Sequence, residues 1–320
     1  MSSLTEPPRG PILWLALQPT PSLFQPLRPG DRIGVCAPAG PVDAAAFERG
    51  LDVLRSFGWP LVVNDQVHAR QRYLAGPDAL RAATLHAFLR DPSIRAIVCA
   101  RGGYGSLRLL ESIDVAALRA DPKPLVGFSD ITALHALWAT AGVASIHGPV
   151  VTQLGGQPAE SIARLKCALA GDALAPHTGL ATITPGRASG ILRGGNLATL
   201  ASLTGTPWMP KLSGAILLLE DIGERPYRLD RFVTQLRTAR ALDGIVGVVL
   251  GDFTDCAESA KGTEPAYTAL DILSEALAPL GVPVAAGAPI GHGALNLAVP
   301  LGRLVTLDAD AGTLSFEATA

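Results

Sequence analysis

Between residue 31 and about residue 150, short apolar runs alternate with segments whose apolar residues recur at helical spacing. The runs at 32–39, 94–100 and 124–128 have the length of buried strands, and the stretch at 44–59 has the spacing of an amphipathic helix. Strands that alternate with helices form a parallel sheet covered on both faces. We therefore predict an α/β fold here, with its chemistry beyond the carboxyl ends of the strands.

The length of the chain predicts about two domains, because 320 residues exceed what one hydrophobic core usually organises. Residues 1–28 are rich in proline and show no period, so we expect a loose leader there. A parallel-sheet domain follows at 29–152. Glycine, proline and alanine around one modest helix predict a linking region at 153–190. Residues 191–320 predict a strand-rich α/β domain that ends in a hairpin with the turn "DADAG".

Charge and composition argue against several classes of partner. The net charge is −2 with no basic block, so we expect no nucleic-acid or membrane-surface partner. The apolar run "ILWLAL" near the N-terminus is shorter than the roughly 18 residues of a membrane span. The four cysteines form no CxxC pair and predict buried free thiols, which suit a reducing compartment. We therefore expect a cytoplasmic protein.

The stretch "PLVGFSDITALHALW" places Ser129 where a strand becomes a helix. A serine there can act as a nucleophile, because the first turn of a helix offers free N–H groups to an oxyanion. Only the first half of the G-x-S-x-G pattern is present, so an ordinary N-cap is the alternative. The turn "RGGYG" at 101–105 follows the preceding strand. Its N–H groups either complete an oxyanion hole with that of Asp130 or only form a tight turn.

A serine nucleophile needs a base, and two histidines stand in suitable places. His147 is expected at the end of a strand, and His292 lies between two glycines in a loop. Glu220 and Asp221 end an apolar strand, and only one of them can face a given histidine because successive strand residues point to opposite sides. Neither HExxH nor a pair of histidines at helical ligand spacing occurs, so we predict no metal and no cofactor.

Several of these strings stand in one order along the chain: "GVCAPAGPV", "RGGYGS…PLVGFSD", "GGNLATLASLTGTPW", "LLLEDIGERPYRLDR" and "GHGALNLAVPLG". Together they resemble the LD-carboxypeptidase family of serine peptidases, from about residue 30 to the C-terminus. The resemblance implies a catalytic triad of Ser129, Glu220 and His292. It also implies an oxyanion hole formed by the N–H groups of Asp130 and Gly103, with Gly102 as the alternative to Gly103.

The resemblance further implies a nucleophile domain and a C-terminal domain that brings Glu220 and His292 to its face. The site is then a cleft between the domains, and the protein is expected to form a homodimer. The implied reaction releases the terminal D-alanine from a murein tetrapeptide during cell-wall recycling. A peptidyl-nucleotide hydrolase of the microcin-immunity type and a non-catalytic binder of small ligands are the alternatives. Four residues are assigned to substrate binding: Tyr104, His147, Asn196 and Trp208.

For two of these four, another role stays open at this point. Trp208 in "GTPW" either shapes the pocket or packs against the core. Asn196 in "GGNL" either contacts the substrate or bonds its own loop.

Overall fold

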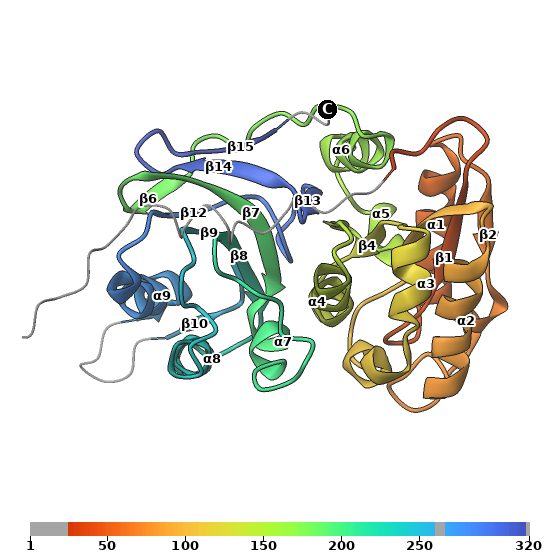
Figure 1. Ribbon diagram of the computed structural model, residues 1–320, viewed down its shortest axis with the longest axis horizontal. Coiled ribbons are helices and arrows are strands. Elements are labelled where there is room, and N and C mark those ends of the chain that lie inside the picture. The colour runs from red at the N-terminus through yellow and green to blue at the C-terminus, as the bar shows by residue number, and fades with distance from the viewer. Residues whose placement is uncertain (1–24, 260–265, 318–320) are drawn as a thin grey trace, which may run out of the picture.

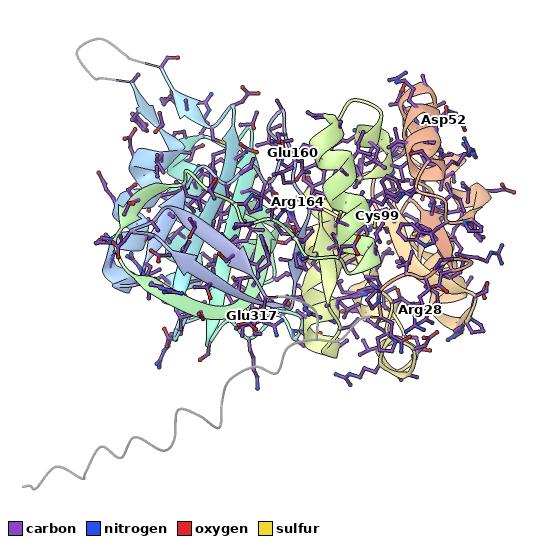
Figure 2. The ribbon with its side chains drawn as sticks, turned by 90° about the horizontal axis from the view of Figure 1, so that it is seen from above. Arg28, Asp52, Cys99, Glu160, Arg164 and Glu317 are labelled. Carbon is purple, nitrogen blue, oxygen red and sulfur yellow. The ribbon has the colours of Figure 1, made fainter. Side chains whose placement is uncertain are left out.

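A computed structural model describes residues 25–259 and 266–317 (Figure 1). The chain forms two large sheets that lie side by side, and Figure 2 shows the same arrangement from above. Most of the predicted leader, residues 1–24, lies outside the described residues. The predicted α/β fold, with a parallel sheet in the N-terminal part and a strand-rich C-terminal part, is confirmed.

The N-terminal sheet has the strand order β13-β5-β4-β3-β1-β2. Strands β1 to β5 are parallel to one another, whereas β13 runs antiparallel to β5. The strands are β1 (Arg32–Cys36), β2 (Leu61–Val63), β3 (Ile94–Cys99), β4 (Leu125–Gly127), β5 (Ser145–His147) and β13 (Val299–Leu301). The helices are α1 (Ala44–Arg55), η2 (Asp65–His68), α2 (Asp78–Arg90), η3 (Ser106–Ser112), α3 (Val115–Ala120), η4 (Ser129–Ile131), α4 (Thr132–Ala141), α5 (Val151–Leu154) and α6 (Ala159–Ala170).

Both faces of this sheet are covered, as its continuous apolar strands require. Alternate strand residues point to opposite faces. Val35 and Val98 pack with α1, α5 and α6, whereas Cys36 and Cys99 pack with α2, α3 and α4. The predicted free thiols are confirmed, and Cys36, Cys99 and Cys256 are buried.

The C-terminal sheet has the order β15-β14-β7-β8-β9-β12-β6. Its four central strands, β7, β8, β9 and β12, are parallel. The strands are β6 (Ala181–Thr184), β7 (Arg187–Asn196), β8 (Ala215–Ile222), β9 (Gly247–Thr254), β12 (Val284–Ala286), β14 (Leu304–Asp308) and β15 (Thr313–Phe316), and β10 (Ala257–Glu258) pairs with β11 (Tyr267–Thr268) apart from the sheet. The helices are α7 (Leu197–Ser202), α8 (Pro226–Thr238), α9 (Ala269–Leu277) and η5 (Ala278–Leu280). Helices α7, α8 and α9 lie on one side of this sheet (Figure 1). The predicted hairpin at "DADAG" is confirmed, because Asp308 pairs with Thr313.

One segment of the C-terminal part crosses to the other sheet. After β12 the chain leaves the C-terminal sheet and forms β13, which pairs with β5 so that Val299 lies opposite His147. The loop between β12 and β13 contains His292. The antiparallel pairing therefore brings this loop to the sheet that carries Ser129.

The two parts also share a hydrophobic core. One cluster of buried side chains extends from Leu134 on α4 to Leu200 on α7 and Leu217 on β8. The segment predicted as a linking region contains α6, which packs on the N-terminal sheet, and β6, which belongs to the C-terminal sheet. The domain boundaries given above stay a prediction. Within the described residues, no helix is both long and apolar enough to cross a membrane.

Candidate active site

Ser129 lies at a sharp turn between β4 and α4. Its φ angle is +62°, in the left-handed region that a residue other than glycine rarely adopts. Such a conformation costs on the order of 1–3 kcal/mol and persists only where the surroundings hold it. The turn lifts the half-buried Ser129 beyond the carboxyl end of the strand, while its neighbours Phe128 and Asp130 stay buried.

The Asp130 carboxylate fastens this turn to the neighbouring glycine-rich loop. It accepts a hydrogen bond of 2.9 Å from the backbone N–H of Ser106, and the Ser106 hydroxyl donates to the backbone carbonyl of Asp130. Burial raises the pKa of Asp130 above its usual value, although the hydrogen bonds from Ser106 oppose this rise. The Asp130 side chain therefore links the serine turn to the glycine-rich loop.

The glycine-rich loop 101–105 is held on its other side by the loop after β1. The N–H of Gly40 donates to the carbonyl of Gly102 at 3.0 Å, and the buried guanidinium of Arg81 donates to the carbonyl of Gly105 at 2.9 Å. A Cβ atom added to Gly102 would lie 3.2 Å from the Cβ of Ser129, so the loop approaches the serine closely because it lacks side chains there.

Two backbone N–H groups beside Ser129 are available to an oxyanion. The N–H of Asp130 belongs to the first turn of a helical segment, where N–H groups have no partner within the helix. No group among the described residues accepts the N–H of Gly103. Gly103 has a φ angle of +106°, which only glycine adopts readily. The two N–H groups flank the groove that Ser129 lines.

Glu220 and His292 form a short hydrogen-bonded pair. His292 Nδ1 lies 2.6 Å from Oε2 of Glu220, which is completely buried at the end of β8. Because a carboxylate accepts a hydrogen bond at Nδ1, the proton of a neutral His292 is held there and Nε2 keeps its lone pair. The pair therefore has the arrangement of a general base and the carboxylate that orients it.

The loop that carries His292 is fixed at several points. Asn296 Oδ1 accepts the N–H of Gly291 at 3.1 Å, and the Asn296 carbonyl accepts the Ser161 hydroxyl of α6. A Cβ atom added to Gly291 would lie 2.6 Å from Oε2 of Glu220. A glycine before His292 is therefore what lets the carboxylate reach the imidazole.

The second oxygen of Glu220 faces His147. Nε2 of His147 lies 3.7 Å from Oε1 of Glu220, just beyond hydrogen-bond distance, and neither atom has a partner among the described residues. Burial favours the neutral acid, but the imidazoles of His147 and His292 outweigh it and lower the pKa of Glu220 below its usual value. The carboxylate is therefore charged near neutral pH, with a histidine on each side.

His292 lies beside Phe128, the residue that precedes Ser129. The two rings pack against each other, with 4.6 Å between the ring centroids. Within the described part of the chain, no hydrogen bond joins the Ser129 hydroxyl to the imidazole. The structure therefore brings Glu220 and His292 together and places both next to the serine turn.

An open groove passes over Ser129, with about 840 Å³ between its walls, part of it open to solvent. One wall contains Gly103, Tyr104 and Asp130 from the N-terminal part, and the other contains Asn196 and Asp221 from the C-terminal part. The Tyr104 side chain is 47% exposed at the edge of this groove. The groove therefore lies between the two parts of the chain.

The other residues expected to bind substrate have different surroundings. The Asn196 amide donates to Asp221 at 2.8 Å and accepts from the N–H of Thr199 at 3.0 Å, so it caps α7 and bonds its own loop. Trp208 packs, partly buried, against the hydrophobic core and does not line the groove. His147 is fully buried behind Phe128, with 5.9 Å between the ring centroids.

The sequence predicts no role for Asp221 beyond its place next to Glu220. In the structure Asp221 lines the groove, on the opposite side of β8 from Glu220. Its carboxylate accepts hydrogen bonds from the N–H groups of Ala198 and Ile222, each at 2.9 Å. Burial raises the pKa of Asp221 to about 6, and these hydrogen bonds oppose the rise. Successive strand residues point to opposite sides, which predicts that only one of the two carboxylates faces the histidines. In the structure Glu220 faces the histidines and Asp221 faces the groove.

We expect Asp221 to make the protein less stable as the pH rises from about 4 to about 6. In this window the folded protein binds a proton that the unfolded chain, with an Asp pKa of 3.8, has lost. A shift of about two pKa units corresponds to roughly 3 kcal/mol. Urea unfolding at about pH 4 and pH 7 should show the stability of the wild type, relative to Asp221→Asn, falling by roughly 2–3 kcal/mol over this range. Asp65→Asn, which removes an exposed carboxyl, is the control. A difference between wild type and Asp221→Asn that does not change with pH would contradict the assignment.

No group of three or more histidine, cysteine, aspartate or glutamate residues in the described ranges is arranged to hold a metal ion.

Comparison with known families gives two matches, one for each part of the chain. Residues 33–148 match the profile of the LD-carboxypeptidase N-terminal domain, and residues 189–307 match that of the LD-carboxypeptidase C-terminal domain. Together the matches cover well over half of the chain.

Individual relatives match over nearly their whole length. A putative carboxypeptidase of Synechocystis is 43% identical, over 91% of this chain and 96% of its own. The murein tetrapeptide carboxypeptidase of Pseudomonas aeruginosa is 36% identical, over 90% of this chain and 97% of its own. The solved structure of MccF in complex with glutamyl sulfamoyl guanosine superimposes with a TM-score of 0.82 at 26% identity, over 94% of this chain and all of that one.

Proposed function

This chain belongs to the LD-carboxypeptidase family, and from that premise we propose that it is a serine carboxypeptidase that releases the terminal D-alanine from murein tetrapeptides. One observation carries the proposal more than any other. His292, which is paired with Glu220, packs against Phe128 beside a serine held at a strained strand-to-helix turn. A serine nucleophile requires an oriented base beside it. An ordinary helix cap requires neither such a base nor a strained backbone.

In the proposed reaction, Ser129 Oγ attacks the carbonyl carbon of the amide bond before D-alanine. His292 Nε2 takes the hydroxyl proton as the C–O bond forms, and the carbonyl oxygen becomes an oxyanion. The C–N bond then breaks, and His292 gives its proton to the leaving amine of D-alanine. Water, deprotonated by His292, hydrolyses the acyl-enzyme ester and restores the Ser129 hydroxyl. The Ser129 hydroxyl must first turn toward His292, an adjustment that active sites commonly make when substrate binds.

The N–H groups of Asp130 and Gly103 are proposed to hold the oxyanion. Both belong to segments that the Asp130 carboxylate fastens together through Ser106. Their positions are therefore set before substrate arrives, which is what makes such donors effective. Glu220 keeps the proton on Nδ1 of His292 and stabilises the imidazolium that forms during attack.

The groove over Ser129 is proposed to take the peptide, with Tyr104 and Asn196 at its walls. Asn196 acts there by fixing the Asp221 carboxylate and the start of α7. The location is proposed to be the cytoplasm, the role cell-wall recycling, and the assembly a homodimer. Neither a metal nor a cofactor takes part in the steps described above.

A second candidate is hydrolysis of a peptidyl nucleotide. It is favoured by the likeness to MccF, a self-immunity protein whose structure contains glutamyl sulfamoyl guanosine. The same serine, base and oxyanion donors would cleave that amide as well. The two candidates differ only in what lies on either side of the amide carbonyl.

The test uses the purified protein and three substrates followed by mass spectrometry. A muropeptide tetrapeptide that ends in D-alanine should lose one alanine, because water replaces the amine at the acyl carbon. The diastereomer that ends in L-alanine should stay intact. A peptidyl-nucleotide amide is the third substrate. Cleavage of this amide with the tetrapeptide intact would replace the main proposal by the second candidate, and no cleavage of any substrate would favour a non-catalytic binder.

A further inference from the structure

His147 faces the oxygen of Glu220 that does not bond His292. It ends β5, where it pairs with Gly127 of β4 on one side and with Val299 of β13 on the other. The side chain is completely buried, and neither ring nitrogen has a hydrogen-bond partner among the described residues. A buried polar group without a partner is costly, and the atom that best relieves this cost is an unpaired acceptor nearby.

Oε1 of Glu220 is such an acceptor. It is buried, it has no hydrogen-bond partner in the described part of the chain, and it lies 3.7 Å from Nε2 of His147. Burial opposes the charge of this carboxylate, but the imidazoles of His147 and His292 lower the pKa of Glu220 below its usual value. A shift of about 0.5 Å would bring Nε2 within the roughly 3.2 Å of an ordinary N–H···O bond. The two unpaired atoms are therefore complementary to each other.

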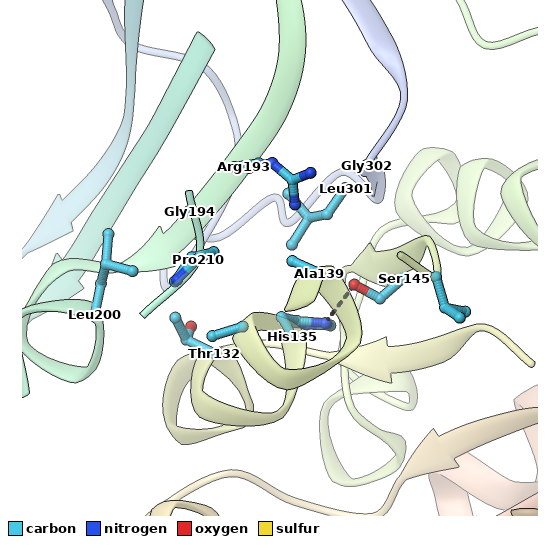
Figure 3. Close-up of a pocket in the computed structure, with 12 residues that line it drawn as sticks. Thr132, His135, Ala139, Ser145, Arg193, Gly194, Leu200, Pro210, Leu301 and Gly302 are labelled. Carbon is cyan, nitrogen blue, oxygen red and sulfur yellow. Dashed lines mark hydrogen bonds between the residues drawn. The ribbon is translucent and has the colours of Figure 1, made fainter. Parts of the chain in front are cut away.

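Two other side chains beside the ring of His147 cannot accept this hydrogen bond. Phe128 is apolar, with 5.9 Å between the ring centroids. His135 on α4 lies at 6.2 Å by the same measure, and both of its nitrogens have partners. Nε2 donates to the carbonyl of Gly127 and Nδ1 accepts the Ser145 hydroxyl, each at 2.8 Å; the second of these bonds is the dashed line in Figure 3. Burial lowers the pKa of His135 to about 3, so this ring stays neutral in that arrangement.

The charge of Glu220 decides which nitrogen of His147 carries the hydrogen. With the hydrogen on Nδ1 alone, the lone pair of Nε2 would face a charged oxygen, and the Nδ1–H would be buried without an acceptor among the described residues. With the hydrogen on Nε2, the ring donates toward Oε1, and only the acceptor lone pair of Nδ1 stays unpaired. The imidazolium form would donate from Nε2 as well. In either protonation state, an N–H of His147 therefore points to the carboxylate.

We propose that His147 is a positioning residue of the active site, which donates from Nε2 to Oε1 of Glu220 and so aims Oε2 at Nδ1 of His292. A carboxylate that is bonded through one oxygen can still turn about its last side-chain bond, whereas bonds to both oxygens fix its plane. His147 acts through Glu220 and does not contact the substrate. The expected effect on the rate rests on the proposed peptidase reaction, but the hydrogen bond itself does not.

The first experiment compares His147→Phe and His147→Gln in the release of D-alanine from the tetrapeptide. Phenylalanine keeps a flat ring but has no N–H, so kcat should fall about 10–100-fold while KM stays within about twofold of the wild type. Glutamine reaches about as far as the imidazole and donates from its amide, so it should restore most of the loss. His68→Phe, which replaces an exposed histidine in η2, should keep the wild-type kcat. A wild-type kcat in His147→Phe, or an equal loss in both His147 variants, would overturn the proposal.

A second measurement needs neither a variant nor a substrate. In a neutron structure of wild-type crystals exchanged into heavy water at neutral pH, deuterium should occupy Nε2 of His147 and point at Oε1 of Glu220. A bare Nε2 with deuterium on Nδ1 would overturn the proposal, even if both His147 variants fail to fold. A wild type that releases no D-alanine would instead reject the proposed peptidase reaction, and the neutron result would still decide whether His147 holds the carboxylate.

Discussion

Ser129→Ala is expected to lower kcat for release of D-alanine by about 10⁴–10⁶-fold and to leave the fold intact. The substitution removes the only atom that forms the acyl-enzyme in the proposed reaction. What remains is binding in the groove and the oxyanion donors of Asp130 and Gly103, which alone give a small residual rate. KM should change little if it reflects binding, because the peptide contacts the groove walls and not only the serine hydroxyl.

The same variant should leave the backbone turn and the stability nearly unchanged, whereas loss of a capping hydroxyl would lower the stability by about 1 kcal/mol. Ser129 is held at a φ of +62°, and alanine has the same steric difficulty there but no polar side chain. The melting temperature of Ser129→Ala should therefore stay within a few degrees of the wild type. Ser56→Ala, which removes an exposed serine at the end of α1, is the matched control and should keep full activity.

Mass spectrometry of the tetrapeptide gives the rate, and a serine-directed phosphonate gives an independent readout. The wild type should gain the mass of one phosphonyl group and Ser129→Ala should gain none. Normal turnover by Ser129→Ala would show that another residue attacks the substrate. If the wild type is labelled but does not cleave the tetrapeptide, Ser129 is a reactive group and only the proposed substrate is wrong.

In the N-terminal half, the alternation of short apolar runs with helical segments was sufficient to predict the parallel sheet. Each strand there is a continuous apolar run, as expected for a sheet covered on both faces. The strand-to-helix junction at Ser129 could be located in the same way. The positive φ angle of Ser129 could not be predicted, because the spacing of hydrophobic residues carries no information on the sign of a backbone angle. The role of the Asp130 carboxylate was missed for a related reason: its partner Ser106 lies in another loop.

The choice between His147 and His292 could not be made from periodicity. Both histidines reach Glu220, and they do so because β13 pairs with β5 across more than 150 residues of chain. Such a long-range pairing leaves no local pattern in the sequence. The motif resemblance selected His292, and the structure places His292 Nδ1 at 2.6 Å and His147 Nε2 at 3.7 Å from the carboxylate.

Glu220→Gln is expected to lower kcat by about 10⁴-fold although the side chain keeps its size. The wild-type carboxylate accepts the Nδ1 proton of His292 and holds the imidazole with a free lone pair on Nε2. A glutamine can present its NH₂ group to Nδ1 instead, which places the proton of the neutral ring on Nε2 and removes the base. Even when its oxygen faces Nδ1, the amide has no charge to stabilise the imidazolium that forms when Ser129 attacks.

The low pKa of Glu220 gives this prediction a second readout. A carboxyl group whose pKa is lowered on folding stabilises the protein above its unfolded pKa of 4.5, and this contribution is lost as the pH falls through the folded value. Glu220→Gln should lack that contribution, so its deficit in stability at pH 7 relative to the wild type should shrink in acid. Glu275→Gln, which changes an exposed carboxylate on α9, should keep both the activity and the pH profile of the wild type. If Glu220→Gln kept its activity but lost stability at pH 7, the carboxylate would be only a structural partner of His147 and His292, and the group that orients His292 would have to be another one.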